Sequence, residues 1–316
     1  MKALHDIVLG AGLAAFENAA LRISEVCIAT PLLPLGLTQQ CSVKPECLQP
    51  TGSFKLRGAM NVASALSQAE AIVTASAGNF AQGLAYCCNR LGLPLTVHVP
   101  DTASAAKIAR LMALEAAVVV HDFPTWWRML ETREAPGAGV FIHPAAEALV
   151  IEGNATIGLE LARSSVEFDT VLVPVGGGGL IAGIAAGLRA AGRKVRVVAC
   201  EIESSTPVTL AMAAGRPVPA TRGASWVDGI GGQGVLDAMW PLFEALVDDA
   251  IVVSHDAAEV AFRTAVQDLH IILEGAGAVA LAAAMTAPPS WGRTVAIGTG
   301  GNIAVSEMTR ILGAAS

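Results

Sequence analysis

The sequence has little charge and few aromatic side chains. Of its 316 residues, 15% are charged and 4% are aromatic, and acidic residues outnumber basic ones to give a formal net charge of −7. A protein that binds nucleic acid or an anionic membrane surface needs a basic face, which this balance does not supply. We therefore expect a small-molecule partner, with no nucleic acid and no membrane.

Long uninterrupted apolar runs are also missing. Stretches such as GLIAGIAAGLRAAGRK are rich in Ala and Gly and reach a charge before the roughly 20 residues of a membrane span. Near the N-terminus, Asp6 and Glu17 interrupt the apolar patch, and no export cleavage site follows. The pattern predicts a soluble protein with a cytoplasmic location.

The cysteines form no CxxC pair. Such closely spaced pairs are typical of zinc sites and redox centres, so the pattern favours reduced structural thiols in a cytoplasm and no metal. The six thiols are Cys27, Cys41, Cys47, Cys87, Cys88 and Cys200.

Strand patterns alternate with helix patterns along the chain. Four short apolar segments, AIVTAS, LPLTVHVP, AVVVHD and GVFIHP, are separated by helical patterns, and the alternation restarts with DTVLVPV and KVRVVACE. Such alternation builds parallel sheets. We predict an α/β fold of two lobes, each a mostly parallel sheet flanked by helices. A small lobe of residues 67–144 is inserted in a large cofactor-binding lobe of residues 1–66 and 145–316.

The segment PVGGGGL, residues 174–180, follows a predicted strand and opens a helix. Consecutive glycines let several backbone N–H groups converge on one point, and a helix N-terminus adds a favourable field for an anion. A tight turn would need only one or two glycines. The run Gly176, Gly177, Gly178 and Gly179 therefore predicts a phosphate site, although its order matches neither a dinucleotide fingerprint nor a Walker loop.

Two further strand ends carry polar side chains. In SAGNFAQG, Ser76, Gly78 and Asn79 bring hydroxyl, backbone and amide donors to a helix start, which suits a carboxylate. Simple N-capping by Ser76 or Asn79 is the alternative. In IGTGGNI, the Thr299 hydroxyl stands at the end of the last predicted strand, on the rim of the same crevice. A plain turn is the alternative there.

Lys55, in TGSFKLRGA, stands at a loop-to-helix junction. Most lysines are solvated, but a lysine that burial makes less basic is a nucleophile toward carbonyls and can form a Schiff base. An amine, a phosphate cradle, a carboxylate cradle and a strand-end hydroxyl together meet the needs of pyridoxal phosphate (PLP) holding an amino acid.

The ordered motifs TGSFKLRGA, SAGNFAQG, GGGGL, EGAGA and GTGGN resemble those of the serine/threonine dehydratase group of the tryptophan-synthase-β-like, fold type II, PLP-dependent enzymes, over nearly the whole chain. The resemblance implies PLP in the cleft between the lobes, bound to Lys55 with Phe54 beside the ring. It implies that Asn79 contacts the ring's phenolic oxygen, that the glycine run binds the phosphate, and that Thr299 faces the pyridine nitrogen. The implied substrate-binding residues are Ser76, Ala77, Gly78, Asn79 and Phe80.

The implied reaction is α,β-elimination. Lys55 takes the Cα proton of a 3-hydroxy amino acid, water leaves, and hydrolysis gives a 2-oxo acid and ammonia. Phe80 stands where the family has histidine, which favours a bulkier or less polar substrate than threonine or serine. Ala77 replaces a serine that racemases of the group use, and Thr299 replaces the usual serine or cysteine.

Trp226, Asp228 and Glu274 fall in motifs that resemble family segments near the active-site mouth, with turn or helix-start roles as the alternatives. Glu201 and Glu203 match positions where some members bind a divalent cation, but Pro207 stands near the place of a second carboxylate, so no metal is expected. Trp126 and Trp127 are expected to pack in the small-lobe core.

Other activities remain open on the same scaffold. They are β-replacement, amino-acid racemisation and a catalytically inactive binding paralogue. The sequence KLRGA after the lysine disfavours β-replacement, and the presence of Lys55, Asn79 and the glycine run disfavours an inactive paralogue. A homodimer is the default assembly for such an enzyme.

Overall fold

The computed structural model describes residues 3–36 and 40–314. Its larger sheet has six strands in the order β1-β2-β10-β7-β8-β9. They are β1 (Leu33–Leu35), β2 (Cys41–Pro45), β7 (Thr170–Pro174), β8 (Arg196–Ile202), β9 (Asp249–Val253) and β10 (Thr294–Gly298). Only the pairing of β1 with β2 is antiparallel among those recorded in this sheet.

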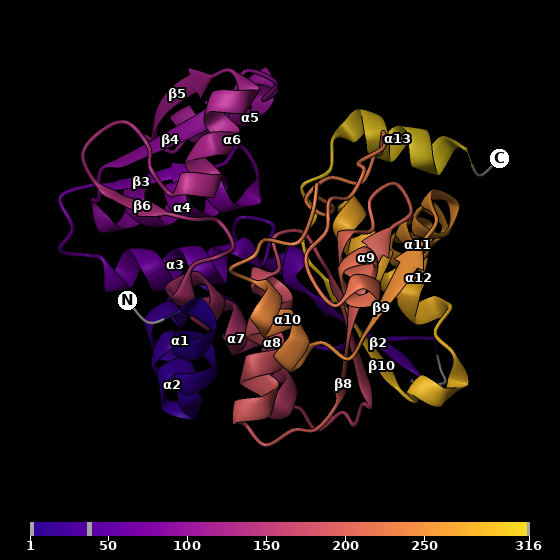
Figure 1. Cartoon of the computed structure of the whole chain (residues 1–316). Coiled ribbons are helices and arrows are strands. Elements are labelled where there is room, and N and C mark those ends of the chain that lie inside the picture. The colour runs from indigo at the N-terminus through magenta and orange to yellow at the C-terminus, as the bar shows by residue number, and fades with distance from the viewer. Residues whose placement is uncertain (1–2, 37–39, 315–316) are drawn as a thin grey trace.

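The smaller sheet has four parallel strands in the order β5-β4-β3-β6. They are β3 (Ile72–Ala75), β4 (Leu95–Pro100), β5 (Ala117–His121) and β6 (Val140–Ile142). Figure 1 shows the two sheets in separate lobes, with helices against both. The predicted fold class, two mostly parallel α/β lobes, is confirmed.

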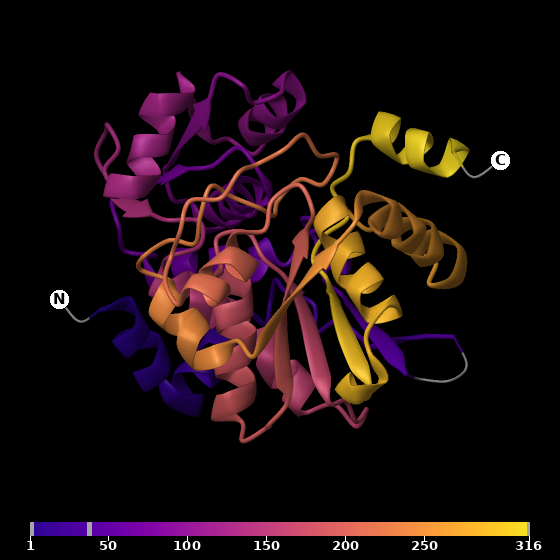
Figure 2. The same ribbon diagram turned by 45° about the vertical axis from the view of Figure 1, so that its right-hand side comes forward.

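Helices cover both faces of the larger sheet. One core contains residues of α1 (Leu4–Gly10), α2 (Gly12–Ile23), α7 (Ala148–Ala162), α8 (Gly179–Ala190), α9 (Pro207–Ala214) and α10 (Trp240–Leu246). The core on the other face contains α11 (His255–Asp268) and α12 (Gly275–Met285), with α13 (Val305–Gly313) packed on α11 (Figure 2). The large lobe also contains two short 3₁₀ helices, η1 (Glu46–Leu48) and η2 (Pro289–Trp291).

The pair α7 and α8 packs unusually closely, because glycines face backbone at the crossing. A Cβ at Gly158 would lie 2.4 Å from the Ile184 carbonyl oxygen, and one at Gly187 would lie 2.3 Å from that of Ala155. No larger residue fits either position without moving backbone. This contact fixes α8, and with it the glycine run at its start.

The small lobe is completed by α4 (Asn79–Leu91), α5 (Ala105–Ala113) and α6 (Phe123–Thr132). Its core also takes apolar residues of α3 (Lys55–Ala65), such as Leu56 and Val62, which pack with Ile72 and Leu84. The same helix packs against α7 of the large lobe. The boundary expected after residue 66 thus follows a helix shared by both lobes, and we keep the limits 67–144 as a proposal.

The prediction that Trp126 and Trp127 pack in the core is wrong. Both are partly exposed, and of α6 only Met129 is buried. Trp126 Nε1 donates to the His98 carbonyl at 3.0 Å, and Trp127 Nε1 donates to Glu131 at 2.7 Å. Trp126, which lines the cavity between the lobes, thus bonds the backbone of a buried residue, and Trp127 bonds an exposed side chain, so both rings stay half-buried with their N–H groups paired.

Residues 216–239 contain no helix or strand. The segment runs between the lobes (Figure 2) and carries Trp226 and Asp228. Within residues 3–36 and 40–314, no helix is long and apolar enough to cross a membrane.

Candidate active site

A cavity of about 830 Å³ lies between the two lobes. Its walls come from the end of β3, the start of α4 and α5 on one side, and from the start of α8 and the end of β10 on the other. Every site residue expected from the sequence borders it: Phe54, Lys55, Ser76, Ala77, Gly78, Asn79, Phe80, Gly176, Gly177, Gly178, Gly179, Trp226, Asp228, Glu274 and Thr299.

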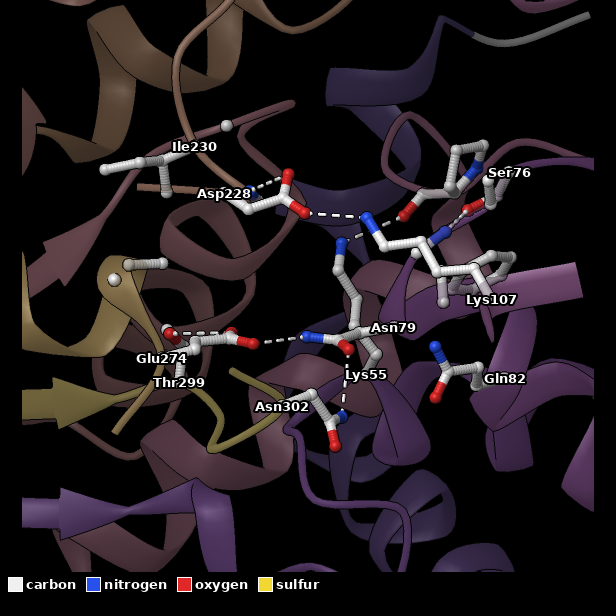
Figure 3. A pocket seen from close by; sticks show the side chains of 18 of the residues that line it. Lys55, Ser76, Asn79, Gln82, Lys107, Asp228, Ile230, Glu274, Thr299 and Asn302 are labelled. Carbon is white, nitrogen blue, oxygen red and sulfur yellow. Dashed lines mark hydrogen bonds and ion pairs between the residues drawn. The ribbon is translucent and has the colours of Figure 1, made fainter. Parts of the chain in front are cut away.

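Lys55 is the first residue of α3 and points into this cavity (Figure 3). Its Nζ donates to the Pro144 carbonyl at 3.4 Å and lies 4.9 Å from the centroid of the Phe54 ring. Burial lowers the pKa of Lys55 to about 8, although the Glu274 carboxylate acts in the opposite direction. Much more neutral amine is therefore present near neutral pH than for a solvated lysine.

The turn before Lys55 is pinned to the end of β10. Phe54 N–H donates to the Thr299 carbonyl at 2.9 Å, and Ser53 forms a β-bridge with Gly300. At Gly52, where φ is +73°, a Cβ would lie 2.8 Å from Asn302 Oδ1. The TGSFK and GTGGN motifs, far apart in sequence, thus form one structural unit.

A buried ion cluster, which the sequence reasoning missed, supports the same helix. Arg57 is 1% exposed and Glu46 is fully buried. Arg57 Nε donates to Glu46 at 2.7 Å, and its Nη1 donates to Glu160 at 2.6 Å; Lys44 also pairs with Glu160, at 2.5 Å. Burial alone would raise the pKa of Glu46, but the charge and hydrogen bonds of Arg57 hold it below its usual value. The cluster fixes the first turn of α3.

Glu274 forms the centre of a second network (Figure 3). Asn79 Nδ2 donates to its carboxylate at 2.7 Å, and the Thr299 hydroxyl lies 3.4 Å from its other oxygen. Asn302 Nδ2 donates in turn to Asn79 Oδ1 at 2.9 Å. Burial raises the pKa of Glu274 to about 7. The carboxyl group can therefore carry a proton close to neutral pH, although sequence alone left a helix-start role open.

The raised pKa of Glu274 predicts a pH dependence of stability. Because the pKa rises from 4.5 to about 7 on folding, the contribution of this group is complete below pH 4.5 and is lost as the pH rises to 7. The loss is about 3 kcal/mol. We expect Glu274→Gln to remove it, which urea unfolding of the cofactor-free protein at pH 5, 6 and 7 will measure. The exposed Glu244→Gln is the control, and equal pH slopes in wild type and Glu274→Gln would refute the prediction.

The glycine run packs closely against neighbouring backbone and side chains. A Cβ at Gly177 would lie 2.6 Å from the Ala145 Cβ, and one at Gly179 would lie 2.6 Å from the Ala145 carbonyl oxygen. Gly178, the N-cap of α8, has φ +85° and carries no side chain that could cap the helix. The first-turn N–H groups of α8 have no partner within the helix and suit an anion such as phosphate.

The alternative of simple N-capping at the SAGN segment does not hold. The N-cap of α4 is Gly78, with no side-chain capping bond. Asn79 uses its side chain on Glu274 and Asn302, and Ser76 Oγ only accepts a long bond, 3.4 Å, from the Gly78 N–H. This leaves the start of α4 open to a carboxylate.

Phe80 borders the cavity but belongs mainly to the small-lobe core. It is 2% exposed and packs in the same cluster as Leu84 and Val97. Little of its ring can therefore face a substrate, which weakens the expectation of an enlarged apolar subsite.

Three polar residues on the small-lobe wall were not expected from the sequence. Lys107 Nζ pairs with Asp228 at 2.8 Å across the cavity mouth, and Arg110 donates to Gln82 Oε1 at 3.1 Å. Figure 3 shows the Gln82 amide nitrogen directed toward the cavity. Lys107 and Arg110 lie three positions apart on α5, a spacing that also fits an ordinary solvated helix face. Asn302 was within reach of sequence reasoning, since it ends the GTGGN motif.

Glu201 and Glu203 accept hydrogen bonds from backbone N–H groups. Glu201 accepts from Val208 N–H at 2.6 Å and Thr209 N–H at 2.8 Å at the start of α9, and Glu203 accepts from His255 N–H at 2.7 Å. Across the described part of the chain, no group of three or more His, Cys, Asp or Glu side chains is arranged to hold a metal ion.

Comparison with known proteins gives a consistent family match. The family model described as pyridoxal-phosphate dependent enzyme matches residues 23–304. An L-threonine ammonia-lyase from Thermotoga maritima is 35% identical, over 85% of this chain and 69% of that protein. A serine racemase from Oryza sativa subsp. indica is 31% identical, over 91% of this chain and 89% of that protein. Among solved structures, a threonine deaminase from T.th. is 32% identical with a TM-score of 0.81, covering 93% of this chain and 99% of that one.

Proposed function

Since the chain belongs to the pyridoxal-phosphate dependent enzyme family, within its fold type II serine/threonine dehydratase group, we propose that it is a dehydratase. It converts a 3-hydroxy amino acid to a 2-oxo acid and ammonia. The observation that carries this proposal is the half-buried Lys55, which shares one cavity with the Asn79–Glu274 network and the open start of α8. Names of relatives such as L-threonine ammonia-lyase support it.

The residues present fit the family's cofactor. The glycine run leaves no room for a Cβ beside Ala145 and keeps the first-turn N–H groups of α8 free for a phosphate. Lys55 would hold the carbonyl carbon, while Asn79 and Thr299 would bind the ring's polar atoms. When bound, PLP supplies an electron sink for the negative charge that develops at the substrate Cα.

The protein's own side chains and backbone groups would transfer the proton, bind the substrate and orient the site. Lys55 Nζ, made less basic by burial, takes the Cα proton as a general base, a role worth about 10²–10⁴-fold in rate. Ser76 and the first-turn N–H groups of α4 bind the substrate carboxylate. Glu274 keeps Asn79 oriented and can hold a proton near neutral pH. The Lys107–Asp228 pair joins the two sides of the cavity mouth.

Dehydration is favoured over racemisation by Ala77. A racemase needs a second acid or base on the face of the substrate opposite the lysine, and Ala77 has no ionisable group there. Serine racemases nonetheless occur among the relatives at similar identity. Measurement of both products distinguishes the two reactions.

The test is a substrate panel with two readouts, 2-oxo acid release and inversion of configuration. The panel holds D- and L-forms of serine, threonine, a bulkier 3-hydroxy amino acid, and 3-hydroxyaspartate, whose second carboxylate suits Lys107 and Arg110. We expect 2-oxo acid without added nucleophile. Inversion without 2-oxo acid would make the protein a racemase, and neither product from any member would remove the proposed function.

We also propose a cytoplasmic homodimer. The six cysteines are free thiols, which suits a reducing compartment. Light scattering coupled to size-exclusion chromatography will give the oligomeric state.

A further inference from the structure

His143 follows β6 directly and begins a turn whose next two residues, Pro144 and Ala145, line the active-site cavity. The sequence motifs did not include His143. The residue is 5% exposed. Its Nδ1 accepts hydrogen bonds from two backbone groups, Ala145 N–H at 3.0 Å and Ala146 N–H at 2.8 Å. Because both partners are donors, Nδ1 must present a lone pair, so the ring is neutral with its proton on Nε2.

The turn that His143 closes carries two contacts to the active site. The Pro144 carbonyl accepts from Lys55 Nζ at 3.4 Å. Ala145 packs so closely on the glycine run that a Cβ at Gly177 or Gly179 would lie 2.6 Å from it. One imidazole therefore supports both the reactive amine and the phosphate cradle.

The far side of the turn is held by a cation. Arg133 Nη1 donates to the Ala146 carbonyl at 2.5 Å, and the same guanidinium pairs with Glu147. Burial, followed by the positive charges of Arg133 and Lys55, lowers the pKa of His143 to about 3. The neutral ring that the geometry requires is thus also the one that its surroundings favour.

We propose that His143 is a positioning residue. Its Nδ1 fixes the 143–146 turn, and this turn places Lys55 and the glycine run at the positions that PLP binding requires. The catalytic part of this inference rests on the proposed function, whereas the effect on cofactor affinity does not. No proton transfer to substrate is assigned to His143, because its Nδ1 bonds the turn and the residue does not line the cavity.

The test compares two substitutions at this position. In His143→Asn the amide oxygen can take the place of Nδ1 as acceptor, whereas His143→Leu fills a similar volume without an acceptor. The matched control is His98→Leu, at another buried histidine of the same sheet, 1% exposed, which bonds His121 and the Pro136 carbonyl. Readouts are the dissociation constant of PLP by absorbance titration, the urea unfolding midpoint, and kcat and KM for 2-oxo acid release.

We expect His143→Leu to weaken PLP binding at least tenfold and to lower kcat by about 10²-fold, as a misplaced reacting group does. His143→Asn should recover most of both. His98→Leu should lower stability but leave the PLP dissociation constant within about threefold of wild type. If His143→Leu fails to fold, His143→Gln, which sets its amide one methylene further out, replaces it.

Two results would overturn the positioning role. One is His143→Leu with wild-type PLP affinity, and the other is His143→Asn no better than His143→Leu in either readout. If wild type binds PLP but turns over no substrate, while affinities still follow the expected order, the proposed function fails and the positioning role stands.

Discussion

Lys55→Ala is expected to lower kcat/KM for 2-oxo acid release by about 10³-fold or more. The substitution removes the lysine amine, which would both hold the cofactor and act as the general base. The free energy of unfolding of Lys55→Ala should not fall along with its activity. The pKa of Lys55 drops from 10.5 to about 8 on folding, so the folded state binds this proton less tightly than the unfolded chain, and below pH 8 the group destabilises the fold. Activity and unfolding free energy at pH 7 should therefore separate in this variant.

Absorbance gives an independent measurement of the same variant. Wild type loaded with PLP should show a band near the violet edge of the visible that borohydride removes by fixing the cofactor to the protein, and Lys55→Ala should take up no covalent label. The exposed Lys194→Ala in the large lobe is the matched control and should behave as wild type. Undiminished 2-oxo acid release from Lys55→Ala would show that the lysine assignment is wrong.

Arg57→Met is expected to lower the free energy of unfolding by about 3–5 kcal/mol, since it leaves the buried Glu46 carboxylate without the arginine that pairs with it. Glu46 is fully buried, and Glu160 would keep only Lys44 as an ion-pair partner. This is a large fraction of the 5–15 kcal/mol by which proteins are typically stable. Urea unfolding of the cofactor-free protein at pH 7 measures the change.

The control for Arg57 is an arginine in an exposed pair. Arg163 lies 2.7 Å from Glu17, with the two side chains 61% and 45% exposed, so Arg163→Ala should change stability by no more than about 1 kcal/mol. The double variant Arg57→Met/Glu46→Leu should regain part of the loss, because the buried charge leaves with its partner. An equal cost for Arg57→Met and Arg163→Ala would show that the buried cluster does not hold α3.

Local patterns of the sequence were enough to predict the fold class and most of the cavity wall. Parallel sheets follow from strand patterns that alternate with helix patterns. The glycine run, the SAGN segment and the lysine can each be recognised from a few neighbouring residues. The ordered motifs then predicted that these segments share a cleft. Their specific roles toward cofactor and substrate remain proposals.

Long-range pairing could not be predicted in the same way. Glu46, Arg57 and Glu160 are spread over more than a hundred positions, and Lys107 and Asp228 meet only because two lobes face each other. The exposure of Trp126 and Trp127 was also misjudged, because an aromatic residue on a helix can be half-buried while its N–H donates to a partner outside the core contacts, here the His98 carbonyl and the Glu131 side chain.

By itself, the sequence determined which chemical groups are available: one amine at a helix start, a run of glycines, and donors at two strand ends. Only the tertiary structure decided their protonation and support. Burial lowers the pKa of Lys55 and raises that of Glu274, and the turn closed by His143 stands behind both the amine and the glycine run. The reason is that desolvation and hydrogen bonding depend on neighbours in space, which residue order along the chain does not specify.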